Sequence, residues 1–289
     1  MSASSIDLSK DARLSFLAAV MRAIEPHARD VPLLLVGAMA RDLLLHYTHG
    51  IPMARATEDL DIAVGMVNWE QFKRLRQHLI DAGGFVAEPG RLHRLRYGTR
   101  LIIDLIPFGG LEENDRSIVW APEDAQVMTV LGYREAAHSA WDVALPERQA
   151  VRVVSLPMLA AMKLVAWRER RLTAPGKDAA DLWLLLTKYL DAGQQDRLYG
   201  DASHLLDADD YDFEAVGAWL LGADAHEVMH QDQHALDSLL DILRPELDRN
   251  GPLRLIADMP RSTNADRALR LLDAFHAGLS GKPSPFASP

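Results

Sequence analysis

The sequence predicts an α+β fold, in which a mixed, mainly antiparallel sheet flanked by helices is followed by a helical carboxyl-terminal region. An apolar run over residues 32–36 and a segment over 59–64 with alternating apolar residues predict the sheet. Amphipathic spacing over the last third of the chain predicts the helical region. Two structural regions of different type are therefore expected.

The chain divides at the point where the mixed pattern gives way to helical spacing. We predict a sheet domain over residues 1–154 and a helical domain over 155–280. The residues from 281 to 289 are rich in proline and small polar residues, so we expect a disordered tail there. The expected helices of the last third cover residues 213–229, 236–247 and 266–279.

The composition is that of a folded protein without cysteine chemistry. Of the 289 residues, 48% are hydrophobic, which suffices for one large core or two ordinary ones. Because the chain has no cysteine, disulfides, thiolate nucleophiles and cysteine-ligated metal sites are excluded. No stretch has the pattern of a secretion signal or a membrane span, so we expect a cytoplasmic protein without a membrane partner.

The negative charge is concentrated in one segment. The formal net charge is −10, but residues 201–250 alone contain 13 acidic side chains and two arginines. The other residues therefore carry 28 acidic against 29 basic side chains. Basic clusters over 91–100 and 167–177 favour contact with the phosphates of a nucleic acid, and a solvated basic surface is the alternative.

The amino-terminal third begins with scaffold and leads to a glycine turn. We expect a frayed start and then a helix that Ser9 caps and that runs to about Ala28. Gly37 follows the apolar strand and precedes a helix over 38–46. A glycine at such a turn lets backbone amides approach an anion closely, so Gly37 and Ala38 are candidates for a phosphate contact.

Two aspartates lie on one face of the next strand. Side chains alternate along a strand, so Asp59 and Asp61 point to one face and Leu60 to the other. Two carboxylates on one face repel each other, and a divalent cation between them relieves the repulsion. A solvated strand end is the alternative for an isolated Asp-Leu-Asp.

A third aspartate interrupts an apolar strand. Asp104 lies within the run over 101–106, which forms a predicted hairpin with residues 91–97 around Gly98. A buried charge is costly without compensation, so Asp104 requires a cation, a partner or an exit to a cleft. An ion pair with one of the arginines of the opposite strand, Arg94 or Arg96, stays open as the alternative.

Three further helices are predicted from their caps. Asn68 caps a helix over 69–81, and Ser155 caps a helix that contains Lys163. A break at residues 175–176 precedes a third helix, with Asp178 near its start, where the helix dipole favours acids. A surface lysine and a dipole-stabilising aspartate are the simplest interpretations of these two side chains.

Taken together, these motifs resemble the DNA polymerase β nucleotidyltransferase superfamily. The shared features are the glycine turn, a loop with Arg55 and Thr57, the Asp-x-Asp strand and the third aspartate. The spacing is most similar to the AbiEii-type nucleotidyltransferase family, whose lysine helix and following Lys-Asp-x-x-Asp-Leu helix resemble residues 156–171 and 177–182. The resemblance covers roughly residues 30–190.

The resemblance implies a reaction and a set of site residues. The reaction is transfer of a nucleoside monophosphate from an NTP to an acceptor hydroxyl, with Mg²⁺ as cofactor. Superfamily members commonly carry Ser or Gly where this chain has Ala38, so a hydroxyl contact to phosphate is missing here. The implied metal ligands are Asp59, Asp61 and Asp104, the implied nucleotide contacts are Gly37, Ala38, Arg55 and Thr57, and the implied helpers are Lys163 for phosphate charge and Asp178 for orientation.

The acceptor is left open by the residues themselves. The resemblance implies the toxin of a bacterial toxin–antitoxin pair, with RNA such as tRNA as acceptor and an antitoxin protein as partner. Transfer to a small hydroxylated molecule such as an aminoglycoside is a second interpretation, which the acidic segment supports. A non-catalytic nucleotide-binding protein is the third, and Ala38 is compatible with it.

Overall fold

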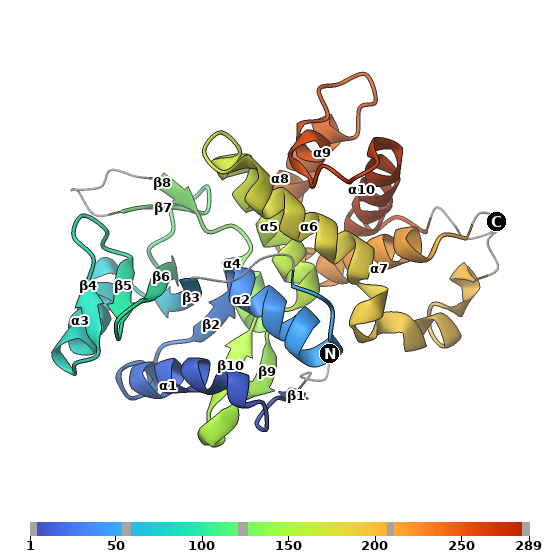
Figure 1. Ribbon diagram of the computed structural model, residues 1–289. Coiled ribbons are helices and arrows are strands. Elements are labelled where there is room, and N and C mark those ends of the chain that lie inside the picture. The colour runs from blue at the N-terminus through green and yellow to red at the C-terminus, as the bar shows by residue number, and fades with distance from the viewer. Residues whose placement is uncertain (1–4, 54–58, 121–126, 207–210, 285–289) are drawn as a thin grey trace. The chain divides into compact units, whose positions relative to one another are not determined.

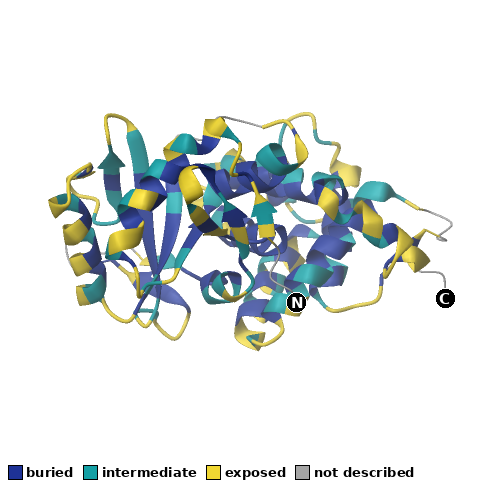
Figure 2. Cartoon of the chain, turned by 90° about the horizontal axis from the view of Figure 1, so that it is seen from below, coloured by how far each residue is buried: buried dark blue, intermediate teal, exposed yellow. Residues whose placement is uncertain are grey.

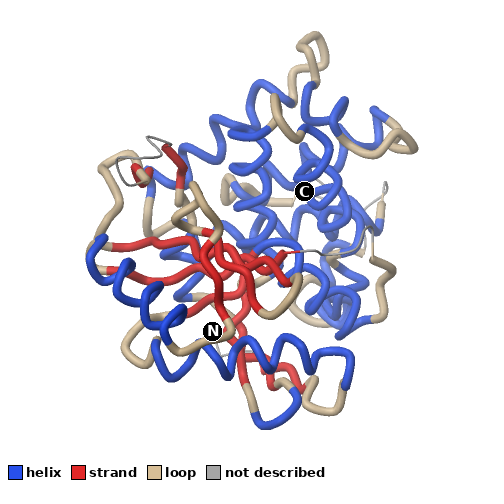
Figure 3. The backbone as a smooth tube through the Cα atoms, turned by 60° about the vertical axis from the view of Figure 1, so that its left-hand side comes forward, coloured by secondary structure: helices blue, strands red, loops and turns tan. Residues whose placement is uncertain are grey.

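The described part of the chain contains ten strands and ten α-helices (Figure 1). Eight of these strands form a single sheet, so the predicted α+β class is confirmed. Figure 3 distinguishes the strands from the helices by colour. The computed structural model describes residues 5–53, 59–120, 127–206 and 211–284.

The chain divides into two units, and the first contains the sheet. This unit comprises Met1–Leu43 and Arg55–Ser155. The second unit comprises Leu44–Ala54 and Leu156–Pro289. The elements of the first unit are β1 (Ser5–Asp7), α1 (Ser15–Ile24), β2 (Leu33–Val36), α2 (Gly37–Asp42), β3 (Asp59–Met66), α3 (Trp69–Asp81), β4 (Phe85–Ala87), β5 (Arg94–Tyr97), β6 (Leu101–Gly109), β7 (Ser117–Val119), β8 (Val127–Thr129), α4 (Tyr133–His138), β9 (Trp141–Ala144) and β10 (Ala150–Val153).

The sheet is mixed, with antiparallel pairs in the majority. Its strand order is β1-β9-β10-β2-β3-β6-β5-β4, and β7 and β8 form a separate two-stranded ribbon. Neighbours are antiparallel in β9/β10, β2/β3, β5/β6 and β4/β5, and parallel in β1/β9, β2/β10 and β3/β6. The parallel pairing of β3 with β6 matters most for function, because both strands carry aspartates.

Strands β3 and β6 run through the core of the first unit. Alternate residues of β3, Leu60, Ile62 and Val64, are at most 1% exposed. Figure 2 shows such buried segments in dark blue. Helix α3 packs against β3 and begins where the Asn68 side chain accepts a hydrogen bond from the Gln71 amide, as its sequence predicts. The buried face fixes the register of β3 and therefore the direction of its aspartates.

The start of the chain differs from the prediction. Ser5–Asp7 is not frayed but forms β1, which pairs in parallel with β9. Ser9 does not cap the first helix, because the first helical turn begins only at Ala12. The Asp11 side chain caps a short 3₁₀ turn that leads into α1.

The second unit is helical in its described residues. Helices over 213–229 and 265–279 agree with the predicted segments, whereas the helix predicted over 236–247 lies at 233–243. Pro175 opens α6 (Pro175–Lys188) at its first turn rather than breaking the chain before it. None of the described helices combines the length and the apolar character that a membrane span requires. Residues 281–283 are exposed and Ser284 is buried, and the Lys282 carbonyl accepts a hydrogen bond from the Trp219 indole. Residues 285–289 lie outside the described residues. The α-helices are α5 (Leu156–Arg170), α6 (Pro175–Lys188), α7 (Phe213–Met229), α8 (Gln233–Leu243), α9 (Arg254–Asp258) and α10 (Ala265–Leu279).

Helices α7 and α10 approach each other through two glycines. A Cβ on Gly278 would lie 2.2 Å from the Trp219 carbonyl oxygen, and one on Gly222 would lie 2.2 Å from the Phe275 carbonyl oxygen. Both obstacles are backbone atoms, which cannot rotate away. The two helix axes therefore approach as closely as they do only because neither position has a side chain.

Gly278→Ala is expected to lower the free energy of unfolding by about 1–3 kcal/mol, because overpacking outweighs the gain in helix propensity. Gly176→Ala in α6 is the matched control, since its Cβ would meet its nearest atom at 3.5 Å, an ordinary contact. The control is expected to be neutral or slightly stabilising. Urea denaturation of both variants checks this, and equal stability of the two would contradict the close crossing.

Candidate active site

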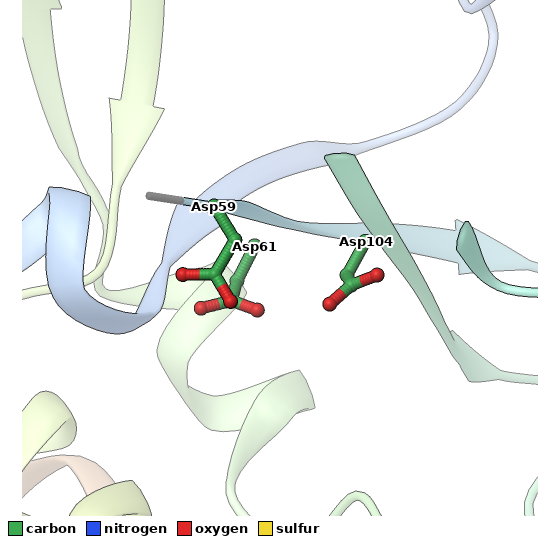
Figure 4. Close-up of side chains that lie close together, drawn as sticks. All are labelled: Asp59, Asp61 and Asp104. Carbon is green, nitrogen blue, oxygen red and sulfur yellow. The ribbon is translucent and has the colours of Figure 1, made fainter. Parts of the chain in front are cut away.

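Three carboxylates meet on one side of the sheet. Asp59 and Asp61 come from β3 and Asp104 comes from β6, as Figure 4 shows. One oxygen from each carboxylate lies within 4.8 Å of the other two. Among the residues that the structure describes, these three form the one group of acidic or histidine side chains with such a geometry. The structure thus brings together the three aspartates that the sequence singled out.

The register of two strands produces this cluster. Asp61 lies opposite Asp104 in the parallel pairing of β3 with β6, and Asp59 lies opposite Ile102. Residues directly opposite each other point to the same face of a sheet, so all three carboxylates share that face. Asp104 is only 8% exposed, whereas Asp59 and Asp61 are half-buried. A charge as buried as that of Asp104 requires compensation.

Gly37 makes room for the central carboxylate. It follows Val36, which pairs with Asp61 across β2 and β3, and it has a φ of 70°. A Cβ at this position would lie 2.0 Å from Asp61 Oδ2. Glycine is therefore required here for two reasons: the backbone is left-handed, and the Asp61 side chain occupies the place of a Cβ.

Gly37→Ala is expected to reduce any activity of the carboxylate site by about 100-fold, because a displacement of the order of 1 Å at a reacting centre has this effect. Gly98→Ala is the matched control: Gly98 has a φ of 60° but no atom within 4 Å of the added Cβ. The control is expected to lose only about 1–2 kcal/mol of the free energy of unfolding, because of its left-handed backbone, and to keep its activity. Similar activities of the two variants would contradict the role given to Gly37.

Arg94 compensates the most buried carboxylate. It lies opposite Asp104 in the antiparallel pairing of β5 with β6. Its Nε is 2.7 Å from Asp104 Oδ1 and its terminal nitrogen is 2.6 Å from Oδ2, which is a bidentate ion pair. The hydrogen bond to Asp104 raises the pKa of Arg94, and the charges of Asp59 and Asp61 raise it further. The ion pair and the carboxylate cluster, weighed as alternatives from the sequence, are both present.

The cluster fits a divalent cation of the hard type. Its donors are carboxylate oxygens alone, which is the donor set that Mg²⁺, Mn²⁺ and Ca²⁺ prefer. The three oxygens within 4.8 Å are near enough to approach one ion together. Three carboxylates this close together repel one another, and a divalent cation between them would relieve that repulsion.

A second charged cluster lies within the helical unit. The Lys163 amine is 2.6 Å from Asp181 Oδ2 and 3.2 Å from Asp178 Oδ1. One terminal nitrogen of Arg170 donates to both carboxylate oxygens of Asp178. Lys163 is 5% exposed and the two aspartates are fully buried. The surface-lysine interpretation is wrong, because Lys163 is buried. Asp178 does lie in the first turn of α6, where the helix dipole favours an acid, but it is buried and ion-paired as well.

The remaining predicted contacts are placed only in part. Ala38 is 2% exposed in the first turn of α2, directly after Gly37. Arg55 and Thr57 lie outside the described residues. Of the residues now seen in the two clusters, Arg94 was considered from the sequence only as a structural partner, and its place opposite Asp104 follows from the hairpin around Gly98.

Comparisons with known proteins support a nucleotidyltransferase. The family described as "Nucleotidyl transferase AbiEii toxin, Type IV TA system" matches residues 19–274. None of the curated proteins matches this chain.

Several solved structures match this chain at low sequence identity and low TM-score. The solution structure of the antibiotic-resistance factor ANT(2'')-Ia has 17% identity and a TM-score of 0.37, covering 66% of this chain and 97% of that one. A nucleotidyltransferase-like antigenic protein from Paracoccidioides brasiliensis has 15% identity and a TM-score of 0.41, covering 68% and 91%. The CCA-adding enzyme of Thermotoga maritima in complex with tRNA has 15% identity and a TM-score of 0.24, covering 95% and 82%.

Proposed function

Because the chain belongs to the AbiEii nucleotidyl transferase toxin family, we propose that it transfers a nucleoside monophosphate from an NTP to a hydroxyl group of RNA. The chain is a nucleotidyltransferase, and the proposal concerns its cofactor, acceptor and site residues. In the reaction, the acceptor oxygen forms a bond to the α-phosphorus of the NTP. The bond between the α-phosphorus and the oxygen that links it to the β-phosphorus breaks. Pyrophosphate leaves.

The carboxylate cluster is the single observation that carries the proposal. Asp59, Asp61 and Asp104 would hold the divalent cation, for which Mg²⁺ is our choice because of the all-oxygen donor set. Such a cation, when bound, neutralises phosphate charge and lowers the pKa of the attacking hydroxyl. The protein holds the three carboxylates ready on two adjacent strands, so no side-chain rearrangement is needed to assemble them.

The other site residues have supporting roles in this proposal. The backbone amides of Gly37 and Ala38 donate hydrogen bonds to phosphate oxygens. The close approach of Gly37 to the Asp61 carboxylate supports this role. Arg55 and Thr57, which lie outside the described residues, are proposed to contact the nucleotide because the family resemblance implies it. Lys163 offsets phosphate charge, and Asp178 orients Lys163, with which it forms an ion pair.

RNA is proposed as the acceptor on two grounds. The family description names a toxin of a type IV toxin–antitoxin system, and a toxin that modifies an essential RNA, tRNA above all, fits that role. The charge distribution agrees, because the chain outside 201–250 is balanced and has a basic cluster over 91–100, next to the carboxylate strand. An antitoxin is the corresponding protein partner.

The test is a transfer assay with each NTP in turn. The purified chain is incubated with Mg²⁺, one α-labelled NTP and total tRNA, and parallel reactions contain an aminoglycoside or no acceptor. We expect label in the RNA with Mg²⁺ and none in the presence of EDTA. Label in the aminoglycoside alone would replace RNA with a small acceptor. Mg²⁺-dependent NTP binding without any transfer would leave a nucleotide-binding protein and refute the catalytic part.

A further inference from the structure

Arg94 occupies an unusual place in a cation site, because it is itself a cation. The guanidinium forms two short hydrogen bonds to Asp104, one to each carboxylate oxygen. Its side chain is 24% exposed, and the side chain of Asp104 is 11% exposed. The ion pair is therefore formed where water screens it only in part.

The influence of Arg94 extends over the whole cluster. Arg94 is hydrogen-bonded to both oxygens of Asp104, and Asp59 and Asp61 each place a carboxylate oxygen within 4.8 Å of one on Asp104. Coulomb interactions are mutual, so Arg94 lowers the negative potential at each of these carboxylates in turn. Arg94 therefore repels a divalent cation that approaches the cluster. In addition, both carboxylate oxygens of Asp104 already accept hydrogen bonds from Arg94.

We infer that Arg94 is the resident counter-cation of the carboxylate cluster and keeps its affinity for a free divalent cation low. The consequence is an order of loading, in which tight cation binding requires the additional negative charge of the NTP phosphates. Arg94 is thus a positioning residue for Asp104 and a regulator of metal occupancy. The inference rests on the proposed function, because it takes the three carboxylates to be the metal ligands.

Arg96 provides a matched control on the same strand. It lies two residues from Arg94 and therefore on the same face of the sheet, but its partner across β6 is Ile102 rather than a carboxylate. Its substitution removes the same charge and the same fork of donors from β5. It leaves the ion pair with Asp104 in place.

The experiment measures Mn²⁺ binding without nucleotide, by the loss of the free-ion signal in electron paramagnetic resonance. Wild type, Arg94→Gln, Arg94→Lys, Arg96→Gln and Asp61→Asn are compared. We expect Arg94→Gln to bind Mn²⁺ at least about tenfold more tightly than wild type. One adjacent positive charge usually lowers the proton affinity of a carboxylate by at least about tenfold, and we expect the same smallest effect for a metal cation. Arg94→Lys, which keeps the charge, and Arg96→Gln are expected to stay within about threefold of wild type.

A second variant guards against poor folding, because Arg94→Gln leaves Asp104 without this partner. Arg94→Ala opens the position to water, and circular dichroism with and without Mn²⁺ establishes that it is folded. Tighter Mn²⁺ binding by either variant supports the inference.

The failures of the two proposals are distinguishable. If wild type binds Mn²⁺, Asp61→Asn does not, and the Arg94 variants bind equally or more weakly, the counter-cation role is refuted and the metal site stands. If neither wild type nor the Arg94 variants bind Mn²⁺ in an Asp61-dependent way, the metal site of the proposed function fails, and the inference fails with it.

Discussion

Asp61→Asn is expected to reduce nucleotidyl transfer by about 10²–10³-fold, the loss typical when one charged group at a transition state is removed. The substitution preserves the shape of the side chain and deletes its charge. Asp61 is the central carboxylate of the cluster, because its strand neighbours are Val36, which precedes the glycine turn, and Asp104. Rates of label incorporation under saturating Mg²⁺ and NTP check the prediction.

The matched control for this variant is Asp142→Asn. Asp142 is also a strand aspartate of the first unit, but it is exposed and lies on β9, which β10 and β2 separate from β3 in the sheet order. Its substitution is expected to leave transfer unchanged, and neither variant is expected to unfold. Transfer by Asp61→Asn within tenfold of wild type, with a normal melting temperature, would remove Asp61 from the site.

The sequence predicted local features of the site well, because they depend on residues close together in the chain. The alternation in β3 places Asp59 and Asp61 on one face, and the Gly98 hairpin pairs β5 with β6. A three-residue loop over 98–100 would even have placed Arg94 opposite Asp104, since Tyr97 and Leu101 close the hairpin. The length of this loop is therefore the feature of the sequence that specifies the ion pair.

Features that depend on distant pairing could not be predicted. The parallel register that sets Asp61 opposite Asp104 crosses the helix α3 and two further strands, and no local pattern specifies it. The strand β1 has three residues and exists because β9 pairs with it, so its sequence alone resembles a frayed end. The loop with Arg55 and Thr57 lies outside the described residues, and its contacts remain a prediction from the resemblance.

The spacing of residues along the helices likewise did not predict the buried charged cluster of the helical unit. Spacing placed Lys163 and Asp178 on two different helices, but only the packing of α5 against α6 brings the amine to Asp178 and Asp181. Arg170 then completes a set of two positive and two negative charges. A lysine enclosed in this way can act on a phosphate or hold two helices together, and the two roles have different experimental consequences.

Lys163→Met is expected to lower the free energy of unfolding by about 3–5 kcal/mol, because it breaks a buried ion pair by removing one partner. Lys188→Met is the matched control on α6, where Lys188 pairs with Asp191 at 2.9 Å but both side chains are about one-third exposed. Its cost is expected to be below about 1 kcal/mol. Chemical denaturation of both variants measures the difference, and equal costs would contradict a stabilising role for the buried pair.

The double variant Lys163→Met with Asp181→Asn separates stability from catalysis. It removes one positive and one negative charge together, so it is expected to regain most of the stability that Lys163→Met loses. If the amine only holds α5 and α6 together, nucleotidyl transfer returns with the stability. If the amine also offsets phosphate charge, as proposed, the double variant folds but its transfer stays about 10²-fold low, since the charge at the nucleotide is still missing. Recovery of both properties would remove Lys163 from the catalytic machinery and leave it as the buried ion pair between two helices.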